Sequence, residues 1–120
     1  MAEQASQILR YSTSEPRTQN NQPKWRINCS HILVQDQALA RQIIDWITET
    51  VPENQHACFE NLAAMYSECG SSLSHGNIGW IEPGMTHINF ERALCCLRPG
   101  QWFPDPVGTD WGWHVIARVE

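Results

Sequence analysis

The sequence lacks three features that would indicate a membrane-bound or secreted protein. None of its apolar runs approaches the roughly 20 residues that a membrane-spanning helix needs. The first twenty residues lack the apolar core of a signal peptide. The five cysteines are odd in number and show no spacing typical of a small disulfide-rich domain. We therefore expect a cytoplasmic protein with reduced thiols and no membrane partner.

Positive charge is scarce in most of the chain. Residues 27–120 carry four Arg and no Lys against eleven Asp and Glu, a formal charge of −7, whereas residues 1–26 carry +2. An acidic domain has little to offer a phosphate backbone, so nucleic acid is not an expected partner. What the chain does contain, 42% hydrophobic residues and six Trp, predicts a folded domain with a substantial core.

Polar residues dominate the N-terminal segment. Residues 1–24 are rich in Ser, Thr, Gln, Asn and Pro, a composition that buries too little apolar surface to order a chain. We predict a flexible polar tail over residues 1–24 and one folded domain over residues 25–120.

Strand and helix patterns are mixed along that domain without a regular alternation of the two. Apolar and alternating runs predict strands over 26–34, 78–81 and 113–119, with a brief one around Val107. Helical spacing predicts a helix of about fifteen residues after the N-cap Asp36, and further helices over 58–68 and 88–97. In the first helix we expect a buried stripe of Leu39, Ile43, Trp46 and Ile47. This mixture predicts an α+β domain.

Two short predicted strands, each with one histidine near its middle, bracket the domain. Between them several short motifs follow in a fixed order: Phe59 to Cys69 with Leu62, Ala63 and Tyr66, then Asn77-Ile78-Gly79, Gly84-Met85, Phe90 and Pro106-Val107-Gly108-Thr109. With His31 in the opening strand and His114 in the closing one, the stretch from about Ile27 to Val119 resembles the parvulin-type peptidyl-prolyl isomerases.

The resemblance implies a fold and an activity. The fold is a four-stranded, mainly antiparallel sheet surrounded by three to four helices. The activity is rotation about X–Pro peptide bonds in client proteins, by a monomer that uses no cofactor and no metal. Resonance sets the barrier at roughly 20 kcal/mol, while the two isomers differ by only about 1 kcal/mol. Such a site breaks no bond; it holds the proline ring in an apolar pocket and favours the twisted amide.

The resemblance also assigns the catalytic residues. It places His31 and His114 together at the floor of the site, sharing hydrogen bonds with Thr109. Taken alone, each histidine would be read as an ordinary hydrogen-bonded core residue. Cys69 stands where the family places a Cys or Asp beside the substrate carbonyl. A small buried hydrophobe and a nucleophile activated by histidine are the alternatives for this thiol.

The implied substrate-binding residues form the walls of the proline pocket. Phe90 occupies the family's aromatic position and Ile78 its apolar turn position. The family usually has Met two residues after the equivalent of Gly84, whereas this chain has Met85 one residue early and then Thr86. Trp111 is placed to crowd or cap the pocket.

Two rival interpretations stay open. One is a weakly active or non-catalytic peptide-binding or chaperone module with the same fold. The other is a metal protein, although Cys29-x-His31 fits no common zinc pattern. Phosphoserine-directed parvulins carry a basic insertion after the first histidine strand, and residues 34–38 contain no cation. We therefore expect an isomerase that is not phosphate-specific and assists protein folding.

Overall fold

The computed structural model describes residues 4–7, 9–10 and 22–120. Most of the predicted tail lies outside the described residues, so its flexibility stays a prediction. At its start, β1 (Gln4–Gln7) and β2 (Leu9–Arg10) pair as a small antiparallel sheet.

A four-stranded antiparallel sheet forms the middle of the domain, in the order β4-β3-β6-β5. Its strands are β3 (Ile27–Val34), β4 (Asn77–Ile81), β5 (Val107–Thr109) and β6 (Gly112–Arg118). The first and last of these strands lie side by side at the centre, with Cys29 opposite Arg118 and Val34 opposite Trp113. The two bracketing segments of the sequence are therefore neighbours in space.

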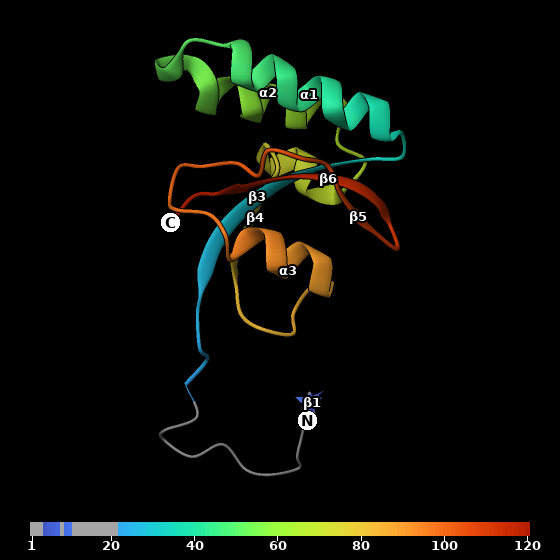
Figure 1. The fold of residues 1–120 in the computed structure, drawn as a ribbon, viewed down its shortest axis with the longest axis vertical. Coiled ribbons are helices and arrows are strands. Elements are labelled where there is room, and N and C mark those ends of the chain that lie inside the picture. Colours follow the sequence, from blue (N-terminus) through green and yellow to red (C-terminus); the bar gives the residue numbers. More distant parts are fainter. Residues whose placement is uncertain (1–3, 8, 11–21) are drawn as a thin grey trace.

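Helices cover both faces of this sheet. Helices α1 (Gln37–Glu49) and α2 (Gln55–Tyr66) lie on one face, and α3 (Ile88–Leu94) lies on the other (Figure 1). Short 3₁₀ helices, η1 (Pro52–Asn54) and η2 (Gly70–Ser74), precede and follow α2. The predicted α+β architecture with a four-stranded antiparallel sheet and three α-helices is confirmed.

Strand alternation divides the core into two layers. Along β3, Ile32 and Val34 pack with the buried residues of α1 and α2, whereas Ile27 and Cys29 pack with α3. Burial raises the pKa of the Cys29 thiol to about 12, so this sulfur stays protonated in the core. His31 has the same parity as Cys29, and its side chain therefore belongs to the α3 side.

The predicted first helix is confirmed, but two residues of its expected buried stripe are not buried, since Leu39 is half-buried and Trp46 is exposed. Asp36 is its N-cap and accepts a hydrogen bond from the Ala38 N–H at 2.9 Å. Ile43 and Ile47 are fully buried, but Trp46 is 39% exposed. The Trp46 ring stacks on Tyr66 of α2, with 6.0 Å between ring centroids, because it lies at the margin where α1 meets α2 rather than over the sheet.

Gly76 lies close against the strand that carries His31. Gly76 has φ +87°, and a Cβ there would lie 2.7 Å from the His31 carbonyl oxygen. Its own carbonyl accepts the His31 N–H at 2.9 Å. Only glycine allows this approach, and it fixes the backbone of β3 at the histidine.

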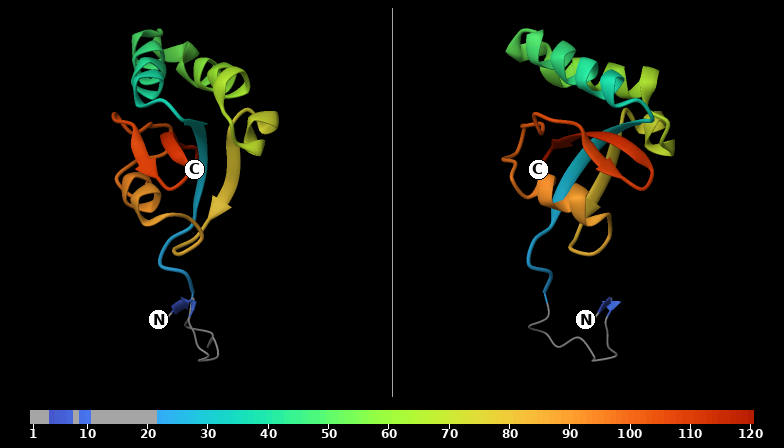
Figure 2. Two further views of the ribbon diagram at one scale, coloured as in Figure 1. Left: turned by 90° about the vertical axis from the view of Figure 1, so that its right-hand side faces the viewer. Right: turned by 45° about the vertical axis from the view of Figure 1, so that its right-hand side comes forward.

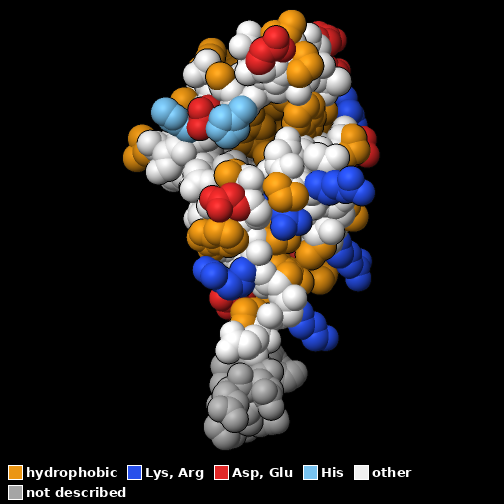
Figure 3. Space-filling view, turned by 90° about the vertical axis from the view of Figure 1, so that its left-hand side faces the viewer, with side chains coloured by type: hydrophobic (Ala, Val, Ile, Leu, Met, Phe, Trp, Pro, Cys, Tyr) orange, Lys and Arg blue, Asp and Glu red, His pale blue; other side chains and the backbone are white. Residues whose placement is uncertain are grey.

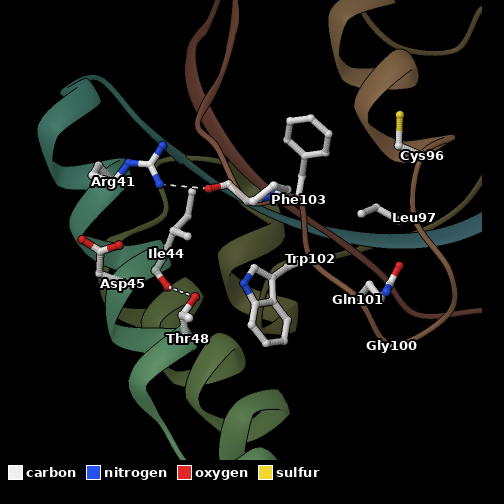
Figure 4. A pocket seen from close by; sticks show the side chains of 11 residues that line it. Arg41, Ile44, Asp45, Thr48, Cys96, Leu97, Gly100, Gln101, Trp102 and Phe103 are labelled. Carbon is white, nitrogen blue, oxygen red and sulfur yellow. Dashed lines mark hydrogen bonds between the residues drawn. The ribbon is translucent and has the colours of Figure 1, made fainter.

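Two surface hollows lie between the α1–α2 layer and the C-terminal part of the domain. One, of about 770 Å³, opens between α1 and residues 96–104, where Arg41 donates to the Pro104 carbonyl (Figure 4). The other, of about 300 Å³, lies beside α2 on the face where apolar side chains gather under the helices (Figure 3). Trp102 lines both, and none of the nine predicted site residues lines either.

Candidate active site

A third pocket brings together all nine side chains that the sequence predicts for the site. It has a volume of about 260 Å³ and lies on the α3 side of the sheet. The left view of Figure 2 faces the side of the domain where α3 and β4 flank β3. Its lining residues are His31, Leu33, Cys69, Ile78, Met85, Thr86, His87, Phe90, Thr109, Trp111 and His114. Leu33 and His87 are the two that sequence reasoning missed.

The two histidines meet at the floor of this pocket because of the β3–β6 register. His31 lies opposite Ile116 and His114 lies opposite Leu33, which makes the two histidines diagonal neighbours on one face. Their Nδ1 atoms are 2.9 Å apart and their rings stack with 5.1 Å between centroids. The Thr109 Oγ1 on β5 lies 2.6 Å from the His114 Nε2.

The hydrogen-bond inventory of this chain favours one set of tautomers. Thr109 Oγ1 accepts from the Trp111 N–H at 3.3 Å and is free to donate its own proton to His114 Nε2. His114 then donates from Nδ1 to Nδ1 of His31. Within this network one buried atom is left without a partner, the Nε2 of His31; the Ser71 hydroxyl is the other such buried group among the described residues. If His31 donated to His114 and His114 donated to Thr109 instead, the hydroxyl proton of Thr109 would also lack an acceptor.

Both imidazoles are neutral at pH 7. Burial, followed by the neighbouring His114, lowers the pKa of His31 to about 4. Burial, followed by His87, lowers the pKa of His114 to about 4 as well. Both rings are buried and cannot keep a positive charge hydrated, which is the physical cause of the two shifts. The pair is thus a hydrogen-bonded scaffold without charge.

Phe90 forms a wall of the pocket and is also part of the core. Its ring meets both histidines edge to face, with centroids 5.7 Å from His31 and 5.4 Å from His114. It is 3% exposed and packs with Ile81 and Leu94 in the core layer under α3. Its aromatic ring therefore links the core to the pocket floor.

The rim of the pocket is apolar and open to solvent. Ile78, Met85 and Trp111 are 37%, 61% and 62% exposed. The Trp111 carbonyl accepts from the Gln35 side chain at 2.7 Å, and its indole meets the His87 ring edge to face. Trp111, which the sequence places to crowd or cap the pocket, thus lies at the pocket edge. Gln35, just after the end of β3, holds the backbone of Trp111 there.

Cys69 lies just after α2, partly buried, with its side chain in the lining of the pocket. A thiol nucleophile needs an adjacent base. The hydrogen bonds of the two histidines go to each other and to Thr109, and among the described residues the remaining His31 nitrogen has no partner at all. This geometry does not favour the nucleophile alternative.

Charge is sparse inside the pocket. None of its lining residues is Lys or Arg. The Thr86 hydroxyl is taken up by the Glu91 carboxylate at 3.0 Å, which removes a free polar group from the wall. Over the part of the chain that the structure describes, no cluster of three or more His, Cys, Asp and Glu could hold a metal ion. The same residues contain no helix that is long and apolar enough to span a membrane.

Residues 28–120 match the sequence profile of the family described as "Rotamase: PPIC-type PPIASE domain". This chain belongs to that family. The motifs from His31 to His114 predict a parvulin-type domain, and this family match confirms the resemblance. The roles of individual pocket residues stay predictions.

Known relatives of this rotamase domain include chaperones and a parvulin. It is 35% identical over 99 residues to the chaperone SurA of Nitrosospira multiformis, covering 71% of this chain and 22% of that protein. A structure from a study of PEB4 and the periplasmic protein Cj1289, described as SurA-like chaperones of Campylobacter jejuni, has a TM-score of 0.75 and 30% identity and covers 79% of this chain and 38% of that one. The parvulin NmPin of Nitrosopumilus maritimus has a TM-score of 0.65 and 32% identity and covers 82% of this chain and 100% of its own.

The rotamase domain corresponds to different shares of these proteins. It spans about a fifth of the length of the curated relatives that it matches, and the whole length of the small parvulin. The activities and partners of the longer relatives therefore belong to larger proteins than this domain.

Proposed function

We propose that this domain catalyses cis–trans isomerisation of X–Pro peptide bonds in unphosphorylated segments of client proteins. The observation that carries the proposal is the single pocket in which a neutral histidine pair, an aromatic wall and an apolar rim converge. Membership of the rotamase family and the likeness to SurA-type chaperones support the same substrate class.

The mechanism that we infer depends on the shape of the pocket and on the exclusion of water from it. The proline ring enters between Phe90 and the apolar rim, where contact with water is reduced. The planar amide owes its barrier to charge-separated resonance, and the twisted amide loses that charge separation. A site with little free polarity therefore disfavours the planar form more than the twisted one.

The histidine pair acts as a positioning scaffold in this proposal. Nδ1–Nδ1 and Oγ1–Nε2 bonds tie β3, β6 and β5 together under the pocket. Cys69 supplies a polarisable edge beside the substrate carbonyl and forms no covalent bond. Thr109, His31 and His114 keep the floor rigid while the amide rotates.

A second candidate function is peptide holding without turnover. The exposed Met85 and Trp111 on the rim favour it, because large apolar side chains at a pocket mouth bind unfolded segments. The names of the longer relatives, which are chaperones, point the same way. We rank it below catalysis because all the side chains predicted to be catalytic line the pocket.

The compartment and the assembly state form a separate part of the proposal. We propose a cytoplasmic monomer, because free thiols such as the five cysteines of this chain are typical of a reducing compartment. One structural relative comes from a study that names a periplasmic protein. Fractionation of the native cell, with detection of the untagged protein by antibody, tests the compartment.

The test of catalysis is refolding of a small protein whose slow phase is limited by one X–Pro bond. A substoichiometric amount of the domain is expected to accelerate this phase in proportion to its concentration. A holding module would instead slow refolding or need equimolar amounts. No effect at any concentration would remove both candidate functions.

A further inference from the structure

Glu91 is a buried carboxylate whose place the mechanism above does not explain. It follows Phe90 on α3 and is 7% exposed. A buried carboxylate is costly unless hydrogen bonds replace its hydration. The partners of this carboxylate therefore show what the residue does.

All the side-chain partners of Glu91 lie in the loop between β4 and α3. The Gly84 N–H donates to both carboxylate oxygens at 3.1 Å. The Thr86 N–H and the Thr86 hydroxyl donate to Oε2 at 2.9 Å and 3.0 Å. Three donors from two loop residues thus converge on one carboxylate. An ionised carboxylate has two acceptor oxygens and no donor, so it can accept from all three.

This loop carries part of the pocket. Met85, Thr86 and His87 line the pocket, and the loop residues 82–87 belong to no helix or strand. Met85 is 61% exposed, so packing of its side chain does not hold the loop in place. Gly84 has φ +88° with open space around its Cβ position, so no close contact fixes the chain there.

We propose that Glu91 is a positioning residue that holds the substrate-binding loop in its pocket-forming shape. The hydrogen bonds from these three donors form what we call the Glu91 latch. Through it the loop is tied to the helix turn that also carries Phe90, so the wall and the rim of the proline pocket keep a fixed separation. The latch acts on substrate binding and does not touch the amide that rotates.

The latch accounts for the unusual order of residues at this point of the chain. Thr86 stands where the resemblance expects Met, which would leave a hydroxyl in an apolar wall. The Glu91 carboxylate accepts a hydrogen bond from that hydroxyl, which is thus the third donor of the Glu91 latch. This departure from the family pattern therefore adds a hydrogen bond that helps to hold the loop.

The first test needs no substrate and no variant. Hydrogen exchange measured by NMR is expected to show the amides of Gly84 and Thr86 exchanging at least about tenfold more slowly than an unprotected loop amide. Exchange of both amides at the unprotected rate would overturn the latch.

The second test compares two Glu→Gln variants. Glu91→Gln replaces an acceptor by an amide that turns an N–H toward the loop donors, while Glu53→Gln makes the same change at an exposed carboxylate in η1, outside the pocket lining and the loop. For Glu91→Gln we expect faster amide exchange at Gly84 and Thr86 and a KM about tenfold higher, with kcat changed by less than about threefold. For Glu53→Gln we expect no change beyond about twofold.

The kinetic part of this inference rests on the proposed function, and the exchange part does not. Should the wild-type domain lack isomerase activity, proline-peptide affinity measured by NMR titration takes the place of KM. Ile44→Val, in the core layer under α1 and α2, controls for lost stability alone and is expected to lower the melting temperature without moving KM. A Glu91→Gln variant that melts earlier but keeps the wild-type KM or affinity would show that Glu91 serves stability only.

Discussion

At the scale of single residues, Cys69 is where the candidate mechanism is most exposed to a test. The thiol lies in the pocket lining and is only partly buried, so a carboxylate in its place can stay hydrated on one side. We expect Cys69→Asp to retain more turnover than Cys69→Ala, because a polar edge near the carbonyl is kept. Peptide exchange rates and melting temperatures of the two variants check this. A thiol nucleophile would lose all turnover in both, and the reverse ranking would remove Cys69 from the site.

Phe90 has two roles, which a pair of substitutions separates. Phe90→Ala is expected to lose turnover and also about 3–5 kcal/mol of stability, because the ring is part of the core under α3. Phe90→Leu keeps most of the buried volume and is expected to retain most of the stability while kcat/KM falls about tenfold. Denaturant unfolding and peptide kinetics measure the two effects. Wild-type kinetics in folded Phe90→Leu would assign the ring to the core alone.

The residues of the pocket could be predicted only as far as their motifs reach. The ordered motifs from His31 to His114 contain seven of the nine predicted residues, and Thr86 and Trp111 lie next to them in the sequence, which is why the structure finds all nine around one pocket. Leu33 was missed although it follows His31 by two and shares its strand face. His87 and Glu91 were missed because their places depend on how the loop folds back onto α3, which no local pattern encodes.

At the scale of elements, the pairing of β3 with β6 determines the state of the histidine pair. Unfolding exposes both rings and returns their pKa values to about 6.5, whereas in the folded domain both lie at about 4. Between these values the unfolded chain binds more protons. Stability is therefore complete above about pH 6.5 and is lost as the pH falls toward 4.

This pH dependence can be assigned to the pair by matched variants. Urea unfolding at pH 7.5, 6, 5 and 4 is expected to show a midpoint that falls with pH, and a shallower fall in His31→Asn. His56→Asn changes an exposed histidine, 74% exposed at its side chain, and is expected to keep the wild-type slope. Equal slopes in all three proteins would mean that the pair is not neutral in the folded domain.

The sequence predicted which elements form but misplaced several of their ends. Asp36 marks its helix because a capping side chain acts locally. Helix α2 begins at Gln55 and not at residue 58, since Pro52 starts a 3₁₀ turn that leads directly into it. Trp46 was expected to be buried because spacing alone does not show where a helix face ends and its neighbour begins.

At the scale of the whole molecule, charge determines which peptides the domain should accept. Residues 27–120 carry −7, and the pocket lining contains no Lys or Arg. An anion at the residue before proline would meet repulsion and no guanidinium pair. We expect the rate for matched peptides to fall in the order Ala, Glu, phosphoserine, with a smaller difference at high salt. A large gain with phosphoserine would reveal an anion site that the described residues do not show.

The measurement that tests the account most directly is magnetisation exchange between the cis and trans resonances of an unphosphorylated proline tetrapeptide. With the domain at a few per cent of the peptide concentration, we expect exchange well above the buffer rate, proportional to protein and nearly constant from pH 6.5 to 8, where both histidines are neutral. His114→Asn breaks the scaffold and is expected to lose most of this rate. Exchange at the buffer rate, with the peptide demonstrably bound, would contradict catalysis and leave a peptide-holding module.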